Sequence, residues 1–170
     1  TSDNGLFHGE HRLAFVKYYL YEPAVNVPLV IRGGGFPKGK KVSQMAVNAD
    51  LTPTILGLTG ATPAFPSDGV DLGTLVKPGA KGQPDRGILL ENKSKGGSVH
   101  SEAIHTDRYV YIENDGGSWA ELYDLQKDPD QLKNIAEDPA NASLRAELAK
   151  RLDALRTCKG ASCHDDGSSG

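Results

Sequence analysis

Two neighbouring residues at the start of the chain have side chains that suit a hard metal cation. Asp3 and Asn4 offer a carboxylate and an amide, and Gly5 follows, so a bend in the backbone can turn both side chains towards one point. Calcium and magnesium prefer such oxygen ligands. The same tripeptide is also common as an Asx turn without a ligand, and the residues alone leave that alternative open.

The number of ligands limits what this pair can do alone. Calcium takes about six to eight oxygen atoms, and Asp3 with Asn4 supplies about two or three of them. No acidic cluster nearby has the spacing of further ligands. If the site is real, its other ligands are expected outside this chain.

A lysine in an aromatic run suits the recognition of an oxyanion. Lys17 lies within residues 15–22, which hold a phenylalanine and three tyrosines, and its ammonium group carries three donors for a tetrahedral anion. The alternative is a surface lysine in water. His8 and His11 can donate protons or hydrogen bonds near neutral pH, although both also fit the surface, and their spacing does not match a zinc protease.

The elements that must position these side chains differ between the two halves of the chain. In the first half, residues 5–26 are expected to form an ordered loop, and residues 27–32 a buried strand before a glycine turn. A helix is expected over residues 50–58, with Thr52 as N-cap, Pro53 in the first turn and Gly60 as the stop signal. A long crossover loop follows, at residues 61–87.

The second half favours an antiparallel sheet followed by a helix. The β-rich runs and the turn lie at residues 87–91, 99–104, 108–112, 114–117 (the turn) and 121–125. Residues 143–157 have a helical pattern that Asn141 or Ser143 can cap. Its apolar stripe consists of Leu144, Leu148, Leu152 and Leu155. Strands followed by a helix indicate an α+β subdomain, with the stripe packed on one face of the sheet.

Composition excludes several classes of function. The chain has 170 residues, 38% hydrophobic and 24% charged, which is typical of a folded globular unit. A net charge of −3 gives no reason to expect nucleic acid or an anionic membrane as partner, and the apolar runs are too short to span a bilayer. The chain lacks an initiating Met and a signal peptide, so we expect that its first residue is not the start of the gene product.

Two cysteines, Cys158 and Cys163, lie near the C-terminus. A disulfide across so short a loop would stabilise the fold by about 2 kcal/mol. Two free thiols are the alternative, and a metal pair is less favoured because two further ligands at zinc-like spacing are absent nearby. A disulfide would indicate an oxidising compartment, and therefore a secreted or periplasmic protein.

Taken together, these segments resemble the sulfatase family. The resemblance is carried, in order, by residues 1–13, Lys17 with 21–23, 27–33, 48–56, 105–111, 121–129 with Asn134, and 155–163. It covers nearly the whole chain, and the last segment is similar to the end of bacterial sulfatases related to glucosamine-6-sulfatases. Each segment is short, but their order and spacing make coincidence an unsatisfactory explanation.

The resemblance implies roles for individual residues. Asp3 and Asn4 match the pair that ligates calcium (or magnesium) beside the sulfate ester, and Lys17 matches the lysine that contacts the sulfate. His8 is a second catalytic candidate, although relatives place a histidine where Phe7 stands here. The family's nucleophile is a formylglycine made from a Cys/Ser-x-Pro/Ala-x-Arg motif, and this sequence contains no such motif.

The resemblance also implies an α/β fold of the alkaline-phosphatase-like sulfatase type. Residues 1–86 would be the last part of the catalytic core with part of its sheet, residues 87–163 an antiparallel-sheet and helix subdomain, and residues 164–170 a disordered tail. The expected substrate is a sulfate-ester small molecule or a sulfated glycan, and the expected partner is the missing N-terminal segment of the same enzyme. Tyr18, Tyr19 and His105 are candidates to border the substrate pocket.

Two rival functions follow from the same residues. The first is a phosphodiesterase or phosphonate hydrolase of the alkaline phosphatase superfamily, which shares the metal-binding core; Asn4 favours a sulfatase, because many of those relatives carry histidine there. The second is a non-catalytic fragment or binding module. The isolated chain is expected to be inactive in either case.

Overall fold

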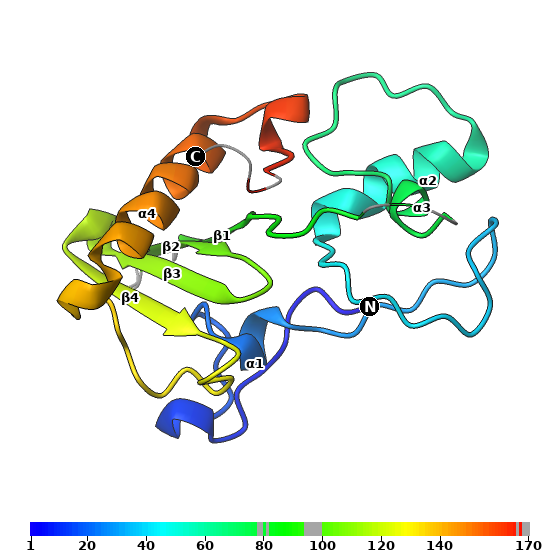
Figure 1. The fold of residues 1–170 in the computed structure, drawn as a ribbon. Coiled ribbons are helices and arrows are strands. Elements are labelled where there is room, and N and C mark those ends of the chain that lie inside the picture. Colours follow the sequence, from blue (N-terminus) through cyan, green and yellow to red (C-terminus); the bar gives the residue numbers. More distant parts are fainter. Residues whose placement is uncertain (78–79, 81, 94–99, 166, 168–170) are drawn as a thin grey trace.

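A four-stranded antiparallel sheet forms one half of the molecule, and the helices α2 (Leu51–Thr59) and α3 (Leu72–Leu75) lie to one side of it (Figure 1). The computed structural model describes the whole chain except residues 78–79, 81, 94–99, 166 and 168–170. The strands are β1 (Ile88–Lys93), β2 (His100–His105), β3 (Tyr109–Asn114) and β4 (Trp119–Asp124), and they pair in the order β1-β2-β3-β4. This is the up-and-down order that short connections between consecutive strands favour. It confirms the antiparallel sheet expected in the second half of the chain.

Two turns set the register of the sheet. Ile104 pairs with Tyr111 across β2 and β3, and the Thr106 N–H donates to the Tyr109 carbonyl at 2.8 Å. Between β3 and β4 lies the short 3-10 helix η3 (Asp115–Gly117), in which Asp115, Gly116 and Gly117 all have positive φ. Glycines adopt this conformation at little cost, which explains why the Asn-Asp-Gly-Gly sequence predicted the turn correctly.

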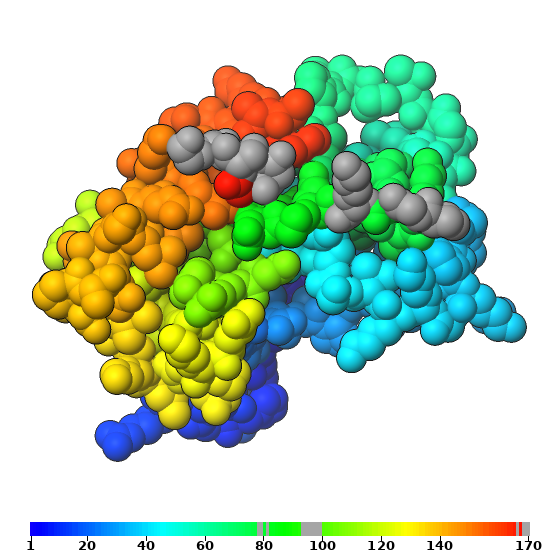
Figure 2. Space-filling model, in the orientation of Figure 1, coloured from blue at the N-terminus to red at the C-terminus, as the bar shows by residue number. Residues whose placement is uncertain are grey.

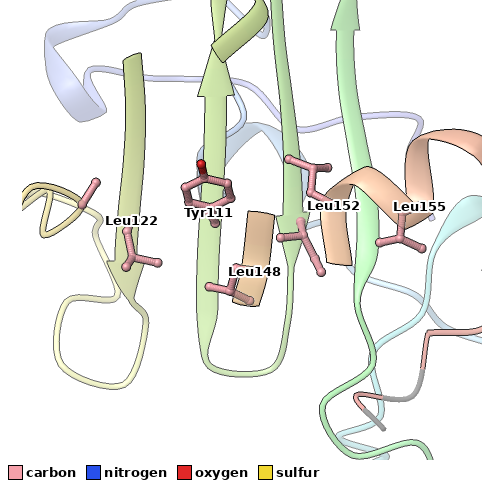
Figure 3. Close-up of a cluster of buried hydrophobic side chains, with 7 residues drawn as sticks. Tyr111, Leu122, Leu148, Leu152 and Leu155 are labelled. Atoms are coloured by element: carbon pink, nitrogen blue, oxygen red, sulfur yellow. The ribbon is translucent and has the colours of Figure 1, made fainter. Parts of the chain in front are cut away.

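The helix α4 (Ala142–Thr157) covers one face of the sheet, as the leucine stripe predicted (Figure 3). Leu148, Leu152 and Leu155 belong to one buried cluster with Tyr111 of β3 and Leu122 of β4. The expected capping by a side chain does not occur at Asn141. Its amide donates instead to the Ile135 carbonyl at 3.1 Å, which ties the helix start to the preceding loop.

The N-terminal segment covers the opposite face of the sheet. Ala103, Val110, Ile112 and Tyr123 alternate with the residues that face α4, and they pack against Leu20 and its neighbours Tyr21 and Val25. Figure 2 shows the blue N-terminal residues and the orange helix on opposite sides of the yellow-green strands. Both faces of the sheet are therefore buried, which explains why its strands carry apolar residues on both sides.

Short helices organise the first half of the chain. They are η1 (Glu10–Arg12), α1 (Glu22–Val25), η2 (Asn48–Asp50), α2 (Leu51–Thr59) and α3 (Leu72–Leu75). Gly60 ends α2 in the left-handed conformation, as predicted. The prediction of Thr52 as N-cap was wrong: Asp50 holds that position and Pro53 lies in the first turn, because η2 already supplies a helical turn ahead of α2. None of the described helices is long and apolar enough to cross a membrane.

The strand predicted at residues 27–32 does not form in the described structure. Its side chains are not buried: Val30 is 84% exposed and Leu29 is 38% exposed. A strand needs neighbouring backbone to satisfy its N–H and C=O groups, and no described strand lies beside this segment. The prediction failed because an apolar β-rich run indicates a strand only where a partner is available.

The C-terminal residues are better anchored than the predicted tail at residues 164–170. The Asp165 carboxylate accepts from Arg151 Nε at 2.9 Å, and the His164 ring nitrogen lies 3.1 Å from the Gly69 carbonyl oxygen. Cys158 and Cys163 form the predicted disulfide, around the short helix η5 (Gly160–Cys163). These contacts hold His164 and Asp165 against the rest of the chain, whereas residues 166 and 168–170 of the expected tail lie outside the described residues.

Candidate functional site

Antiparallel pairing near the N-terminus brings the predicted site residues together. The Phe7 N–H donates to the Val16 carbonyl at 3.1 Å, the Phe15 N–H donates to the Phe7 carbonyl at 2.8 Å, and His8 forms an isolated bridge with Ala14. Phe7 is fully buried and contacts Tyr19 and Tyr21 edge to face. We call this paired segment the N-terminal ribbon, and the buried Phe7 side chain anchors it. The antiparallel pairing places the residues before Phe7 beside the residues after Val16.

Gly5 fixes how the Asp3-Asn4 pair enters this ribbon. Its N–H donates to the Ala24 carbonyl of α1 at 2.8 Å, and a Cβ atom at this position would lie 2.0 Å from the Pro23 carbonyl oxygen. Only glycine allows so close an approach. The Asp-Asn-Gly sequence therefore does more than form a turn, because Gly5 holds Asp3 and Asn4 next to α1.

Lys17 meets this pair directly. Its Nζ donates to Asn4 Oδ1 at 3.0 Å, while Asn4 Nδ2 donates to the Gly5 carbonyl at 2.7 Å and so orients the amide. Asp3 accepts a hydrogen bond from Ser2 Oγ at 3.2 Å. The pKa of Asp3 is lowered by hydrogen bonds from its own backbone, from Ser2 and from the Asn4 backbone, with the charge of Lys17 adding to them. Three residues predicted from the sequence thus lie together in one cluster at the surface.

His8 makes its described contacts away from that cluster. Its backbone N–H donates to Glu10 Oε2 at 2.6 Å, and its ring lies edge-on to Phe15 with centroids 6.2 Å apart. Among its neighbours, His11, Arg12 and Phe15 have positive φ values of 52°, 61° and 56°. Backbone strain of this kind often accompanies functional loops, but no described contact joins His8 to Lys17.

The donors in the cluster suit a hard cation in kind, but not in number. A carboxylate and an amide oxygen are the ligands that calcium or magnesium takes; Asp3 is exposed and Asn4 is half-buried. Among the described residues, no group of three or more His, Cys, Asp or Glu side chains is arranged to hold a metal. Asp3 and Asn4 alone are therefore too few to complete the coordination shell of such a cation.

The aromatic and histidine candidates separate in the structure. Tyr19 lines a pocket of about 230 Å³, whereas Tyr18 and His105 are not among the lining residues. His105 instead pairs with Glu22 of α1, with Nε2 and Oε1 2.6 Å apart. Burial raises the pKa of Glu22, but the hydrogen bonds from His105 and Asn26 outweigh it and hold the pKa below its usual range. The pair joins α1 to the last residue of β2.

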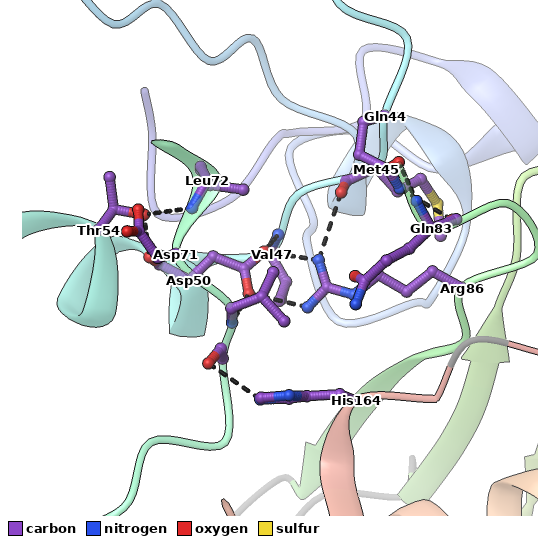
Figure 4. A network of polar contacts seen from close by, with 12 residues as sticks. Gln44, Met45, Val47, Asp50, Thr54, Asp71, Leu72, Gln83, Arg86 and His164 are labelled. Carbon is purple, nitrogen blue, oxygen red and sulfur yellow. Dashed lines mark hydrogen bonds and ion pairs between the residues drawn. The ribbon is translucent and has the colours of Figure 1, made fainter. Parts of the chain in front are cut away.

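Sequence reasoning missed a buried ion pair at the start of α2 (Figure 4). The Arg86 guanidinium donates to both carboxylate oxygens of Asp50, at 2.7 and 2.8 Å, and both side chains are almost fully buried. Asp50 also accepts from the Val47 and Val70 N–H groups. A lone arginine in a Pro- and Gly-rich stretch, 36 positions from its partner, carries no local signal for such a contact.

The chain matches a known family over most of its length. The family described as "N-sulphoglucosamine sulphohydrolase, C-terminal" matches residues 9–158. An arylsulfatase of Chlamydomonas reinhardtii is 31% identical over 99% of this chain and 32% of its own length. The human N-acetylglucosamine-6-sulfatase is 27% identical over 98% of this chain and 36% of its own length. The chain thus spans about a third of the length of these relatives.

Solved structures with the same fold include enzymes of two kinds. A 2-O GAG sulfatase superposes with a TM-score of 0.76 at 28% identity, covering 96% of this chain and 39% of that one. The phosphonate monoester hydrolase of Agrobacterium radiobacter superposes with a TM-score of 0.74 at 27% identity, covering 91% and 33%. A protein solved with its substrate D-glucosamine-2-N,6-O-disulfate shares the fold, with a TM-score of 0.82 at 23% identity over 98% and 35%.

The order of elements agrees with these matches. The four-stranded antiparallel sheet and the long helix α4 form the C-terminal sulfatase subdomain that the resemblance predicted. This chain therefore belongs to the N-sulphoglucosamine sulphohydrolase C-terminal family, among the sulfatases.

Proposed function

We propose that this chain is the C-terminal portion of a sulfatase that hydrolyses the sulfate esters of a sulfated sugar. The observation that carries the proposal is the hydrogen bond from Lys17 Nζ to Asn4 Oδ1, next to Asp3 in the sequence. A cationic donor next to two oxygen ligands suits an anionic ester bound to a divalent cation.

Each residue has a definite part in this proposal. Asp3 and Asn4 hold calcium or magnesium through their side-chain oxygens, and Lys17 holds the non-bridging oxygens of the sulfate. His8 is the second catalytic candidate, because an imidazole can carry a proton near neutral pH. When bound, the cation supplies positive charge opposite the ester oxygens, and a formylglycine supplies the nucleophile.

The nucleophile and the other ligands belong, in this proposal, to an N-terminal segment of the same enzyme. The relatives are about three times as long as this chain, and the sequence has no formylglycine motif. The exposed apolar segment at residues 27–32, with Val30 the most exposed of its large side chains, suits a strand whose neighbours are supplied by that segment.

Two further expectations stay with the proposal. Residues 1–86 complete the catalytic core, and residues 87–163 form the C-terminal subdomain. The Cys158–Cys163 disulfide supports a secreted or periplasmic location, since such bonds persist in oxidising compartments.

A phosphonate or phosphodiester hydrolase is the second candidate. The fold and 27% identity shared with the phosphonate monoester hydrolase of Agrobacterium radiobacter favour it. The same cation, lysine and oxygen ligands would serve a phosphorus centre equally well, because both substrates present a tetrahedral anion.

Matched substrates separate the two candidates. The complete protein would be assayed with the p-nitrophenyl esters of sulfate, phosphate and phenylphosphonate under the same conditions. A sulfatase gives the highest kcat/KM with the sulfate ester and loses that activity when the cation is chelated. A higher kcat/KM with the phosphonate would overturn the sulfatase proposal in favour of the second candidate.

A further inference from the structure

The segment that carries Lys17 has no helix or strand of its own. Residues 17–21 lie between the N-terminal ribbon and α1, and none of them belongs to a described element. On one side of Lys17 the backbone is fixed, because the Val16 carbonyl accepts from the Phe7 N–H. A charged group that must meet a bound anion needs a precise position before the reaction begins. The contacts of residues 18–21 therefore decide how precisely Lys17 is placed.

The antiparallel sheet supplies contacts for this segment. The Tyr18 carbonyl accepts from the side-chain amide of Asn92 on β1, and Leu20 packs in the buried cluster on the same side of the sheet. The Tyr21 hydroxyl donates to Glu121 Oε2 of β4 at 2.8 Å. The residues next to Lys17 are thus held by strands that are distant from it in the sequence.

Glu121 is a fixed acceptor for the Tyr21 hydroxyl. Its side chain is 4% exposed, and it also accepts from Tyr123 Oη at 2.5 Å and from Asn114 Nδ2 at 2.9 Å. Burial, together with the hydrogen bond to Glu121, raises the pKa of Tyr21 and of Tyr123, so both hydroxyls keep their protons at neutral pH. Hydrogen bonds to an ionised acceptor are stronger than those between neutral groups, which makes this contact a firm restraint.

The ring of Tyr21 links this contact to the N-terminal ribbon. It stacks on the His11 ring with centroids 4.2 Å apart and an interplanar angle of 6°, and it meets the Phe7 ring edge to face at 6.3 Å. Phe7 is the residue whose N–H bonds to Val16, next to Lys17. One tyrosine therefore contacts the sheet through its hydroxyl and the ribbon through its ring.

We propose that Tyr21 and Glu121 are positioning residues for Lys17. The hydrogen bond between them holds the segment of the lysine where its ammonium group meets a bound tetrahedral anion, and neither residue touches the substrate. The inference rests on the function proposed above for Lys17. It gives the C-terminal sheet a part in the reaction beyond the stability of the fold.

Tyr21→Phe tests this contact, because it removes the hydroxyl and keeps the ring. The complete protein would be assayed with the ester that the parent hydrolyses fastest, well below the thermal unfolding midpoint of each variant. We expect kcat and kcat/KM to fall together by about tenfold, because a small displacement of a preorganised group weakens transition-state stabilisation by that much or more.

Tyr111→Phe is the matched control. Tyr111 Oη donates to Glu113 Oε1 at 2.9 Å in the same sheet, but its ring is buried in the cluster that contains the leucines of α4. This variant loses an equivalent hydrogen bond and should leave kcat unchanged. An equal fall of kcat in both variants would overturn the proposal, because it would reveal a general effect of loosening the sheet.

A double-mutant cycle with Lys17→Ala separates positioning from a structural loss. If Tyr21 acts through Lys17, adding Tyr21→Phe to Lys17→Ala lowers kcat no further, because the group that it positions is already absent. A structural loss would multiply the two reductions. The full further reduction in the Lys17→Ala background, or an unchanged kcat for Tyr21→Phe alone, would refute the inference.

The parent protein separates the failure of this inference from the failure of the proposed function. An active parent whose turnover depends on Lys17 but not on the Tyr21 hydroxyl refutes the inference alone. A parent that hydrolyses none of the sulfate, phosphate and phenylphosphonate esters refutes the proposed function, and the inference falls with it. The inference also falls if Lys17→Ala keeps full turnover, since Lys17 then has no role that depends on its position.

Discussion

At the scale of the residue, the proposed role of Lys17 depends on its neighbours. Its ammonium group donates to Asn4, and it carries further donors that a bound anion could accept. In a site arranged before the reaction begins, such a donor stabilises developing negative charge more than a mobile solvent molecule does. Its contribution is therefore measurable by removing it from the complete protein.

We predict that Lys17→Ala lowers the turnover of sulfate esters by about 10²-fold or more in the complete protein, because a preorganised charge donor is lost. Lys41→Ala, in the exposed loop after the glycine turn, is the matched control and should leave turnover unchanged. Steady-state kinetics measure both variants. An unchanged rate for Lys17→Ala would remove this residue from the mechanism.

The buried Asp50–Arg86 pair matters for stability rather than for chemistry. We predict that Arg86→Met lowers the free energy of unfolding by about 3–5 kcal/mol, because Asp50 is left buried with an uncompensated charge. The Arg108 side chain is 40% exposed and pairs with Asp124. Arg108→Met should therefore lower the free energy of unfolding by about 1 kcal/mol or less. Urea unfolding measures both, and equal costs would contradict the assignment.

At the scale of elements, α4 is held to the sheet in two ways. Its leucine stripe packs with buried residues of β2, β3 and β4, and Arg156 near its end donates to Glu102 of β2 and Glu113 of β3. The apolar contacts dominate, because partly exposed ion pairs contribute little on their own.

The packing of α4 gives a prediction with an internal control. Leu152 is completely buried, so Leu152→Ala should lower the free energy of unfolding by about 2–5 kcal/mol. Leu132 is 73% exposed, and Leu132→Ala should change it by no more than about 0.5 kcal/mol. Similar losses for the two variants in thermal or urea unfolding would show that α4 does not pack as described.

The contact between α1 and β2 predicts a dependence of stability on pH. The folded pKa of Glu22 lies below its ordinary value of 4.5, so its contact with His105 stabilises the fold fully above pH 4.5. This stabilisation is lost as the pH falls through the folded pKa.

Glu22→Gln should therefore flatten the decline of stability between about pH 5 and about pH 3. Glu137→Gln is the control, since Glu137 makes an ion pair but its side chain is 85% exposed. The unfolding free energy of each variant would be followed across this range. If the unfolding free energies of Glu22→Gln and of the parent chain fall in parallel as the pH is lowered, ionisation of Glu22 does not contribute to the stability of the fold.

At the scale of the whole molecule, the family membership and the incomplete cluster lead to the same expectation. Two side-chain oxygen ligands and one lysine do not form a complete metal site. The relatives, meanwhile, are about three times as long as this chain. The proposed sulfatase activity would therefore draw its remaining ligands and its nucleophile from the N-terminal segment proposed above.

We predict that the isolated 170-residue chain hydrolyses no aryl sulfate and binds calcium only weakly, with a Kd of about 1 mM or higher. Calorimetry with calcium and an assay with p-nitrophenyl sulfate measure the two properties. The Asp3→Ala variant of the same chain is the control for the weak calcium binding. Clear turnover by the highly purified chain would refute the proposal that it lacks its nucleophile.

Local patterns predicted the second half of the chain well. The four strands lie within a few residues of the runs that predicted them, and the glycine turn and the leucine stripe occur where expected. These features depend on contacts between residues close in sequence, or on a periodicity that any sheet or helix face would bury. Residue type and resemblance were enough to select Asp3, Asn4 and Lys17. Their proximity follows from the short antiparallel pairing between Phe7 and Val16.

Contacts between distant residues were decided only by the tertiary structure. The sequence alone determined the antiparallel sheet, the helix that covers it and the side chains available for chemistry. It did not determine that Asp50 meets Arg86, that Glu22 meets His105, or that the buried Glu121 accepts hydrogen bonds from Tyr21 and Tyr123. The strand predicted at residues 27–32 was wrong for the same reason. A strand needs a neighbouring strand and a buried charge needs a partner, and both come from residues distant in the sequence.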